Sequence, residues 1–260
     1  THFLQLKNER KAVPIFGSKL LSGNDYLDEY LKSPEKLRQD FDKLLEFTKQ
    51  LNDTLHSYKI LESQRSLLIS CILIALENKP FRKAYPLYNT TKDLANYLVD
   101  TVSNELTSAN IKGDKLDNLN IQFGFIRTDT SLSTKKGVLK NLVKDIDDNI
   151  NSFIKTHKYY DVLGQLYIEF LRYANSDKGL GIVLTPPHIT ELFSDLAQVN
   201  KNSIAYDNCT GTGGFLISAM KKMISDAKGD QTKIEEIKKS QLFGVEYQSH
   251  IFALAVSNMY

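Results

Sequence analysis

The sequence DNCTGTGGFL (residues 207–216) follows directly on the short apolar run SIAY (203–206) and leads into a run with helical character. Three glycines, Gly211, Gly213 and Gly214, stand within four positions of one another. Glycine adopts positive φ angles readily and lets another group approach the backbone closely. A brief apolar strand, a glycine-rich turn and a helix therefore predict a turn that holds a ligand at the end of a strand.

Beyond this turn, predicted strands and helices continue to alternate. We expect strands over 203–207 and 241–246, and helices over 213–227, over 232–240 and from 249 onwards. A strand, a glycine turn, a helix and a second strand that ends in an acidic residue form the opening of a doubly wound, Rossmann-like α/β sheet. Ligands of such sheets bind beyond the carboxyl ends of the strands, where the amides of a helix start also point.

Two acidic residues narrow the choice among a dinucleotide, a mononucleotide and S-adenosylmethionine. The turn lacks the third glycine of the dinucleotide fingerprint G-x-G-x-x-G, and it lacks the Gly-Lys-Ser/Thr of a P-loop. Asp207, at the end of the first strand, would repel a pyrophosphate but suits a ligand that carries an amino group and a sulfonium. Glu246, at the end of the second strand, is placed to accept hydrogen bonds from ribose hydroxyls. The helix over 232–240 explains why these two acids stand further apart than the usual spacing of about 20 residues.

The first part of the chain has the periodicity of a helical domain. Apolar residues at helical spacing predict buried helices over 33–57, 62–78, 91–108, 135–156 and 160–175. Ser33 and Pro34 form a typical helix start. The segment 79–85 mixes basic and aromatic residues, and we interpret it as a solvated loop rather than a contact to a phosphate backbone. We expect residues 1–32 to be a leader or the tail of an upstream segment, 33–178 a helical domain, and 179–260 the start of the α/β domain.

Composition and charge leave few broad classes open. A net charge of +2 is too small to indicate nucleic-acid or membrane binding by itself. The most apolar run, 66–76, is about half as long as a membrane span, so no membrane segment is expected. Cys71 and Cys209 form neither a disulfide framework nor a zinc pattern, which favours the cytoplasm. Because the chain begins with threonine and has no evident terminator, we expect it to be part of a longer protein.

Three motifs in order give the chain a specific resemblance. LTPPHITELFSDLA (184–197), YDNCTGTGGFLISAM (206–220) and LFGVEYQ (242–248) resemble the modification subunits of type I restriction–modification systems, and the same methylase module in fused single-chain restriction enzymes. The resemblance covers about 135–260, including DVLGQLYIEFL (161–171) before the motifs. It implies a DNA adenine-N6 methyltransferase that uses S-adenosylmethionine, with no metal required.

The resemblance also implies which residues contact the cofactor. Two positions depart from the family: Leu184 replaces the aromatic residue of Tyr/Phe-Thr-Pro, so a ring contact is lost, and Asn208 replaces a proline, which loosens the turn. Thr185 and Pro186 have an alternative role as a helix cap, and Glu246 as an ordinary surface acid. The predicted cofactor residues are Ile182, Val183, Leu184, Thr185, Pro186, Pro187, Asp207, Gly211, Thr212, Gly213, Gly214, Phe215 and Glu246.

The catalytic loop that the resemblance implies is missing from these residues. In the family, an Asn/Asp-Pro-Pro-Tyr/Phe loop hydrogen-bonds the amine of a flipped adenine and stacks on the base. The Pro-Pro at 186–187 follows a threonine and precedes the glycine turn, so it does not match. We therefore expect the loop beyond residue 260, no catalytic residue among these 260, and no methylation by them alone.

The implied partners are double-stranded DNA and a specificity subunit or target-recognition domain, with a restriction (nuclease/helicase) subunit or segment as a further one. Two alternatives stay open on the residues alone. One is an S-adenosylmethionine-dependent methyltransferase that acts on RNA or protein. The other is a helical module that docks a DNA-specificity subunit and keeps only a vestigial cofactor fold.

Overall fold

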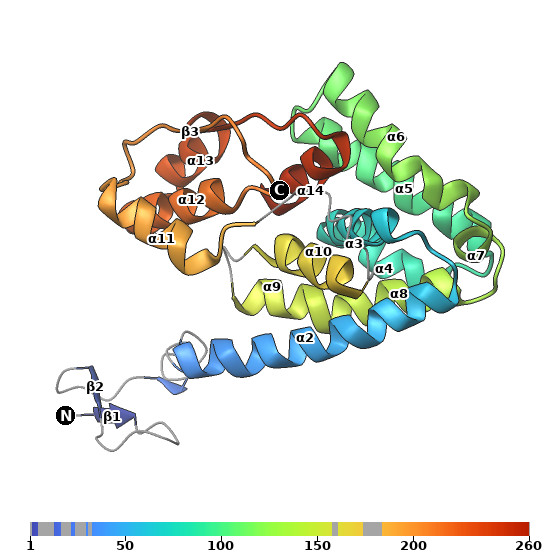
Figure 1. Ribbon diagram of the computed structural model, residues 1–260, viewed down its shortest axis with the longest axis horizontal. Coiled ribbons are helices and arrows are strands. Elements are labelled where there is room, and N and C mark those ends of the chain that lie inside the picture. Colours follow the sequence, from blue (N-terminus) through green and yellow to red (C-terminus); the bar gives the residue numbers. More distant parts are fainter. Residues whose placement is uncertain are drawn as a thin grey trace.

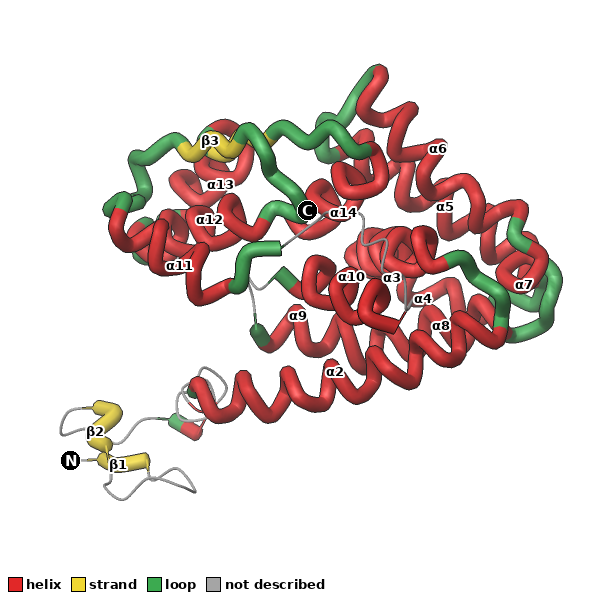
Figure 2. Tube along the Cα trace, in the orientation of Figure 1, coloured by secondary structure: helices red, strands yellow, loops and turns green. Residues whose placement is uncertain are grey.

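The structure is a computed structural model in which a helical part precedes a small α/β part (Figure 1). The residues that it describes are 2–4, 13–16, 22–23, 30, 33–157, 161–173 and 184–259. Near the N-terminus, strands β1 (His2–Leu4) and β2 (Val13–Phe16) pair antiparallel. Figure 2 shows that helices dominate and that strands are few and short.

Helices and helical turns make up the secondary structure of the described ranges 33–157 and 161–173. The first, α2, begins where the sequence predicts, because the Ser33 side chain accepts a hydrogen bond from the Lys36 amide at 3.2 Å and Pro34 occupies the first turn. The elements are α2 (Pro34–Ser57), α3 (Glu62–Glu77), α4 (Lys79–Ala84), the 3-10 turn η1 (Tyr85–Leu87), α5 (Thr91–Ser108), α6 (Asp114–Thr128), α7 (Thr130–Ser133), α8 (Val138–Ile146), the π-helical turn η2 (Asp147–Asn151), α9 (Ser152–Thr156) and α10 (Val162–Tyr173).

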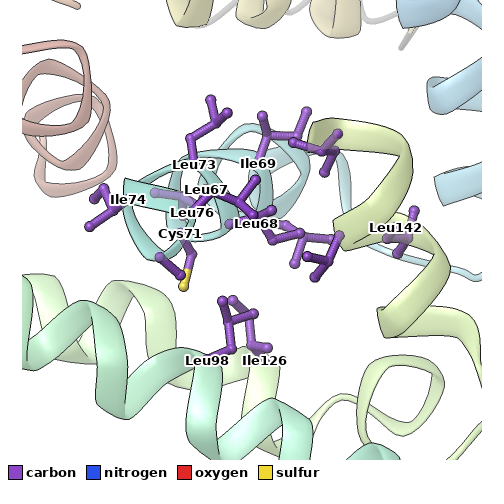
Figure 3. Close-up of a cluster of buried hydrophobic side chains, with 14 of the residues drawn as sticks. Leu67, Leu68, Ile69, Cys71, Leu73, Ile74, Leu76, Leu98, Ile126 and Leu142 are labelled. Atoms are coloured by element: carbon purple, nitrogen blue, oxygen red, sulfur yellow. The ribbon is translucent and has the colours of Figure 1, made fainter. Parts of the chain in front are cut away.

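Helix α3 is the centre of this part. Its residues from Arg65 to Leu76 are all buried, so it has no solvent face, and helices α5, α10 and α14 (Ser249–Met259) pack against it. Figure 3 shows its side chains meeting Leu98, Ile126 and Leu142 from neighbouring helices. A helix that is apolar all round is stable only when enclosed in this way, which confirms that the run 66–76 is a core element. Among the described residues, no helix combines the length and the apolar content that crossing a bilayer requires.

Three details of the helical part differ from the sequence prediction. Segment 79–85 is not a loop: it is helical up to Tyr85, and Phe81 and Tyr85 are buried in the core. Helix α6 was not predicted, because its apolar residues do not form one clear stripe. The helix expected over 135–156 starts only at Val138, after Gly137 in a left-handed conformation, and contains the π-helical turn η2.

The remaining elements form a small parallel unit. They are α11 (Pro187–Leu196), β3 (Ala205–Asp207), α12 (Gly214–Asp226), α13 (Gln231–Ser240), β4 (Leu242–Gly244) and α14. Strands β3 and β4 pair parallel, with Asp207 opposite Gly244, so both carboxyl ends lie at the same edge. The predicted order of strand, glycine turn, helix, strand and helix is therefore confirmed.

Helices cover one side of this two-stranded sheet. Ala205 and Leu242 pack against the core of α12 and α13. Tyr206 and Phe243, which are paired neighbours in the register, are exposed. Helix α14 links the unit to the helical part, because it packs on α3 and α6, and Asn118 donates a hydrogen bond to Ser249 at 2.9 Å.

Candidate functional site

The glycine-rich turn is fixed to the ends of both strands. The Val245 amide donates to the Asp207 carbonyl at 2.9 Å, and the Thr210 amide donates to the Val245 carbonyl at 3.0 Å. The Thr210 hydroxyl also donates to the Asp207 carbonyl at 3.0 Å. These bonds continue the parallel pairing past β3, so the turn starts from a defined position at the carboxyl edge of the sheet.

Two glycines give the turn its path. Gly211 has φ +55° and Gly213 has φ +94°, a left-handed region that side chains disfavour. Gly213 is the N-cap of α12 and carries no side chain, so the first amides of the helix have no side-chain cap. The start of α12 therefore keeps donors that a bound ligand can use.

The Asp207 carboxylate stabilises the first bend of the turn. Its Oδ1 accepts a hydrogen bond from the Cys209 amide at 3.0 Å, and the side chain is partly exposed. None of the described residues donates a hydrogen bond to its Oδ2. Asp207 therefore holds the turn and still presents an acceptor and a negative charge beside it.

Glu246, two residues after the end of β4, reaches across to the same turn. Its Oε2 accepts from the Gly211 amide at 3.1 Å, and its Oε1 accepts from the Gln248 amide at 2.7 Å. Each carboxylate oxygen has two lone pairs, so both retain acceptor capacity. Nearby, burial lowers the pKa of His250, and the charge of Glu246 opposes this shift.

A third carboxylate lies behind the turn. Asp161 precedes α10, is 8% exposed, and accepts hydrogen bonds from the Thr212 hydroxyl, the Gly164 amide and the Asn258 side chain, each at 2.8 Å. Asn258 also donates to the Thr212 carbonyl at 2.8 Å. Burial raises the pKa of the Asp161 carboxyl, and these hydrogen bonds act in the opposite direction. The Thr212 hydroxyl therefore points into the protein rather than into solvent.

The segment before α11 lies beside the turn. Leu184 is 3.9 Å from the position that a Cβ would take at Gly211. The alternative role of Thr185 and Pro186 as a helix cap, with Thr185 as N-cap and Pro186 as the first helical residue, is wrong by one residue: Pro186 is the N-cap, and Pro187 begins α11. Ile182 and Val183 lie outside the described residues.

Two contacts hold α11 against α12. The Thr190 and Ser218 hydroxyls are 2.6 Å apart, and the rings of Phe193 and Phe215 meet edge to face at 5.7 Å. Phe215, in the first turn of α12, therefore has a packing role towards α11. This pairing fixes the start of α11 relative to the glycine turn.

A cleft of about 730 Å³ opens next to the strand ends, between β4, α12, α13, α14 and the end of α5. Of the predicted cofactor residues that the structure describes, Glu246 lines this cleft and the others do not; Thr210, the neighbour of Gly211, lines it as well. Its wall is mostly apolar and also includes the exposed residues Lys238 and Lys239. Of the predicted residues, Glu246 alone connects the glycine turn to this cleft.

Sequence reasoning missed two residues that support the turn, Asp161 and Asn258. Asp161 stands at the start of the segment DVLGQLYIEFL, and aspartate is a preferred residue directly before a helix, where it caps the first amides. That signal predicts the cap but not its partner Thr212, which is 51 residues away. Asn258 gives no sequence signal, since nothing near it marks a buried polar contact.

The chain is similar to known proteins, and a family model matches its second part. Residues 158–260 match the family model described as N-6 DNA Methylase. The chain is 32% identical over 247 residues to the type II restriction enzyme and methyltransferase RM.BcgI of Heyndrickxia coagulans, which covers 90% of this chain and 37% of that protein. It is 38% identical over 74 residues to the type I restriction enzyme MjaIX methylase subunit of Methanocaldococcus jannaschii, covering 28% of this chain and 13% of that protein.

The fold has a counterpart among solved structures. The chain matches a modification subunit assigned to a type I restriction enzyme of Vibrio vulnificus YJ016 with a TM-score of 0.52 and 16% identity, over 84% of this chain and 52% of that one. The chain thus spans little more than a third of RM.BcgI and about half of the matched structure. The resemblance to the N6 DNA methylase module of restriction–modification systems is confirmed.

Proposed function

We propose that the chain is part of a DNA adenine-N6 methyltransferase of a restriction–modification system, and that its glycine turn binds S-adenosylmethionine. One observation carries the proposal: the hydrogen bond of 3.1 Å from the Gly211 amide to Glu246 joins the turn after β3 to the acid after β4. Both groups lie at the carboxyl edge of a parallel sheet, where ligands of such folds bind.

The charge around the turn supports a cationic ligand. Asp207, Glu246 and Asp161 place three carboxyl groups next to a backbone that is short of side chains. A phosphate would meet repulsion there, whereas a sulfonium and an amino group gain from negative charge within a partly desolvated site. S-adenosylmethionine carries both cations, and the free acceptors of Glu246 suit its ribose hydroxyls.

We assign the cofactor contacts to two segments and one acid. The segment from Ile182 to Pro187 leads into α11, the turn supplies Asp207 and Gly211 to Phe215, and Glu246 accepts hydrogen bonds from the ribose hydroxyls. Within the turn, backbone amides bind the ligand, while the Thr212 hydroxyl stabilises the loop from behind. These residues bind and orient the cofactor, which supplies the methyl group when bound.

The fold that goes with this function is a Rossmann-like methyltransferase domain behind a helical domain. In this proposal residues 1–32 are a leader, 33–178 the helical domain, and 179–260 the start of the cofactor domain. The exposed pair Tyr206 and Phe243 supports further coverage of the sheet, since a doubly wound sheet buries both faces.

The methyl transfer itself requires a group to position adenine N6, whose lone pair is delocalised into the ring. No Asn/Asp-Pro-Pro-Tyr/Phe sequence occurs in these 260 residues, so we place the catalytic loop outside them. The proposal includes double-stranded DNA as substrate, a specificity subunit or target-recognition domain as partner, a restriction subunit or segment as a further partner, and the cytoplasm as location.

The test is methyl transfer from labelled S-adenosylmethionine by the natural full-length protein. We expect label in duplex DNA that contains the target sequence, recovered as N6-methyladenine after digestion, and none in RNA or protein. The 260-residue chain by itself is expected to give no turnover. Label in RNA or protein alone, or turnover by the 260-residue chain, would contradict the proposal.

A further inference from the structure

Asp161 lies where two helices begin. As the N-cap of α10, its Oδ1 accepts a hydrogen bond from the Gly164 amide at 2.8 Å. Its Oδ2 accepts from the Thr212 hydroxyl at 2.8 Å, in the turn that leads into α12. The carboxylate is therefore next to the amino-terminal, partly positive ends of α10 and α12.

Two glycines, Gly164 and Gly214, lie close to the Asp161 carboxylate. A Cβ at Gly164 would lie 2.4 Å from Oδ2, so only glycine fits beside the carboxylate. A Cβ at Gly214, the first residue of α12, would lie 3.5 Å from the same oxygen. Because that distance is an ordinary contact, the negative charge lies against the first residue of α12.

Burying the charge of the Asp161 carboxylate carries a desolvation cost. Asp161 is 8% exposed, no basic side chain donates a hydrogen bond to it among the described residues, and burial raises its pKa. Its partners are neutral donors, namely the Thr212 hydroxyl, the Gly164 amide and the Asn258 side chain. An asparagine side chain could make a similar set of bonds without the desolvation cost of a buried charge.

We propose that Asp161 is a positioning residue that offsets the positive end of α12 and so gives the glycine turn its preference for a cationic ligand over an anionic one. In phosphate-binding folds the start of this helix attracts anions. Here the buried Asp161 carboxylate lies beside the first residue of α12. Its hydrogen bond from Thr212 also holds the glycine turn in place. This inference rests on the proposed function, since the cation in question is the sulfonium of S-adenosylmethionine.

The test compares two ligands that differ by one methyl group and one positive charge. The natural full-length protein and its Asp161→Asn variant are titrated by calorimetry with S-adenosylmethionine and with S-adenosylhomocysteine, and both proteins are also melted. We expect the variant to lose roughly three- to tenfold in affinity for S-adenosylmethionine and less than about twofold for S-adenosylhomocysteine, because only the first ligand carries the sulfonium charge. Its melting temperature stays equal or rises, because the buried charge is gone.

The control is Asp40→Asn, which removes a partly buried carboxylate that pairs with Lys36 and His157 in the helical part. This variant is expected to leave the ratio of the two affinities unchanged. Equal losses for both ligands in Asp161→Asn, or no loss for either, would overturn the inference. If the unsubstituted protein binds neither ligand, the proposed function itself fails, and that result is distinct from any effect of the variant.

Discussion

Gly213 and its neighbour Gly214 offer a matched pair of substitutions within the glycine turn. Gly213 has φ +94°, and an added Cβ would meet nothing closer than 3.9 Å, so alanine there suffers from backbone strain and not from crowding. Gly214 is the first residue of α12, and its added Cβ would have ordinary contacts at 3.5 and 3.8 Å. One alanine is thus strained and the other is not, only one residue apart.

The structure sets the size of each effect. A non-glycine residue in a left-handed conformation costs about 1–2 kcal/mol. Alanine in place of glycine in a helix gains up to about 1 kcal/mol. For a protein of this size, each kcal/mol shifts the melting temperature by about 2–4 °C. We therefore expect Gly213→Ala to melt about 2–8 °C lower and Gly214→Ala to melt at the same temperature or higher.

Thermal unfolding followed by circular dichroism measures both variants under the same conditions. Equal losses in the two variants would show that crowding, and not the φ angle of Gly213, limits the turn. A Gly213→Ala variant as stable as the unsubstituted protein would refute the left-handed conformation at this residue.

Three further results are expected. At Gly244, an added Cβ would lie 2.4 Å from the Thr210 hydroxyl, so Gly244→Ala should cost at least about 1–3 kcal/mol in urea unfolding; an unchanged midpoint would contradict this contact. In the native protein, thiol labelling should proceed at exposed Cys209 and spare Cys71, whose burial raises its pKa; rapid labelling of both would contradict the burial of α3. Burial also raises the pKa of Asp161 above 3.8, so the folded protein holds this proton more tightly than the unfolded chain. The free energy of unfolding should therefore fall as the pH rises from about 3.8 through the folded pKa, and Asp161→Asn should lack this component; identical pH profiles would argue against it.

The helices that sequence patterns predict best are those with a capped start and a single apolar stripe. Helix α2 has Ser33 and Pro34 at its start, and α5 begins and ends at the predicted residues. Helix α6 has neither signal: Gly113 is an N-cap without a side-chain bond, and Ile121 is exposed on its outer face. The π-helical turn η2 packs against α2 and α3, and no local pattern encodes these contacts.

The site, too, has features that local sequence predicts and features that only the tertiary fold shows. The glycine turn and the two strand-end acids follow from local order, because a strand that ends in an acid leaves that acid at the edge of the sheet. The bonds from Gly211 to Glu246 and from Thr212 to Asp161 join residues 35 and 51 positions apart. They require the tertiary fold, and they turn the Thr212 hydroxyl inwards, which the motif alone does not indicate. The cofactor contacts of all the predicted site residues stay predictions, and residues 182 and 183 lie outside the described part of the chain.

Calorimetric titration of S-adenosylmethionine into the natural full-length protein tests the assignment of the glycine turn most directly. We expect saturable binding that weakens roughly ten- to a hundredfold in Glu246→Gln, because a charge-assisted hydrogen bond contributes about 1.5–3 kcal/mol. Asp207→Asn should also weaken it, while Asp100→Asn, which alters an exposed pair with Arg127 in the helical part, should leave it unchanged. The assignment would be contradicted if the unsubstituted protein bound no S-adenosylmethionine. It would also be contradicted if both Glu246→Gln and Asp207→Asn bound it as tightly as the unsubstituted protein.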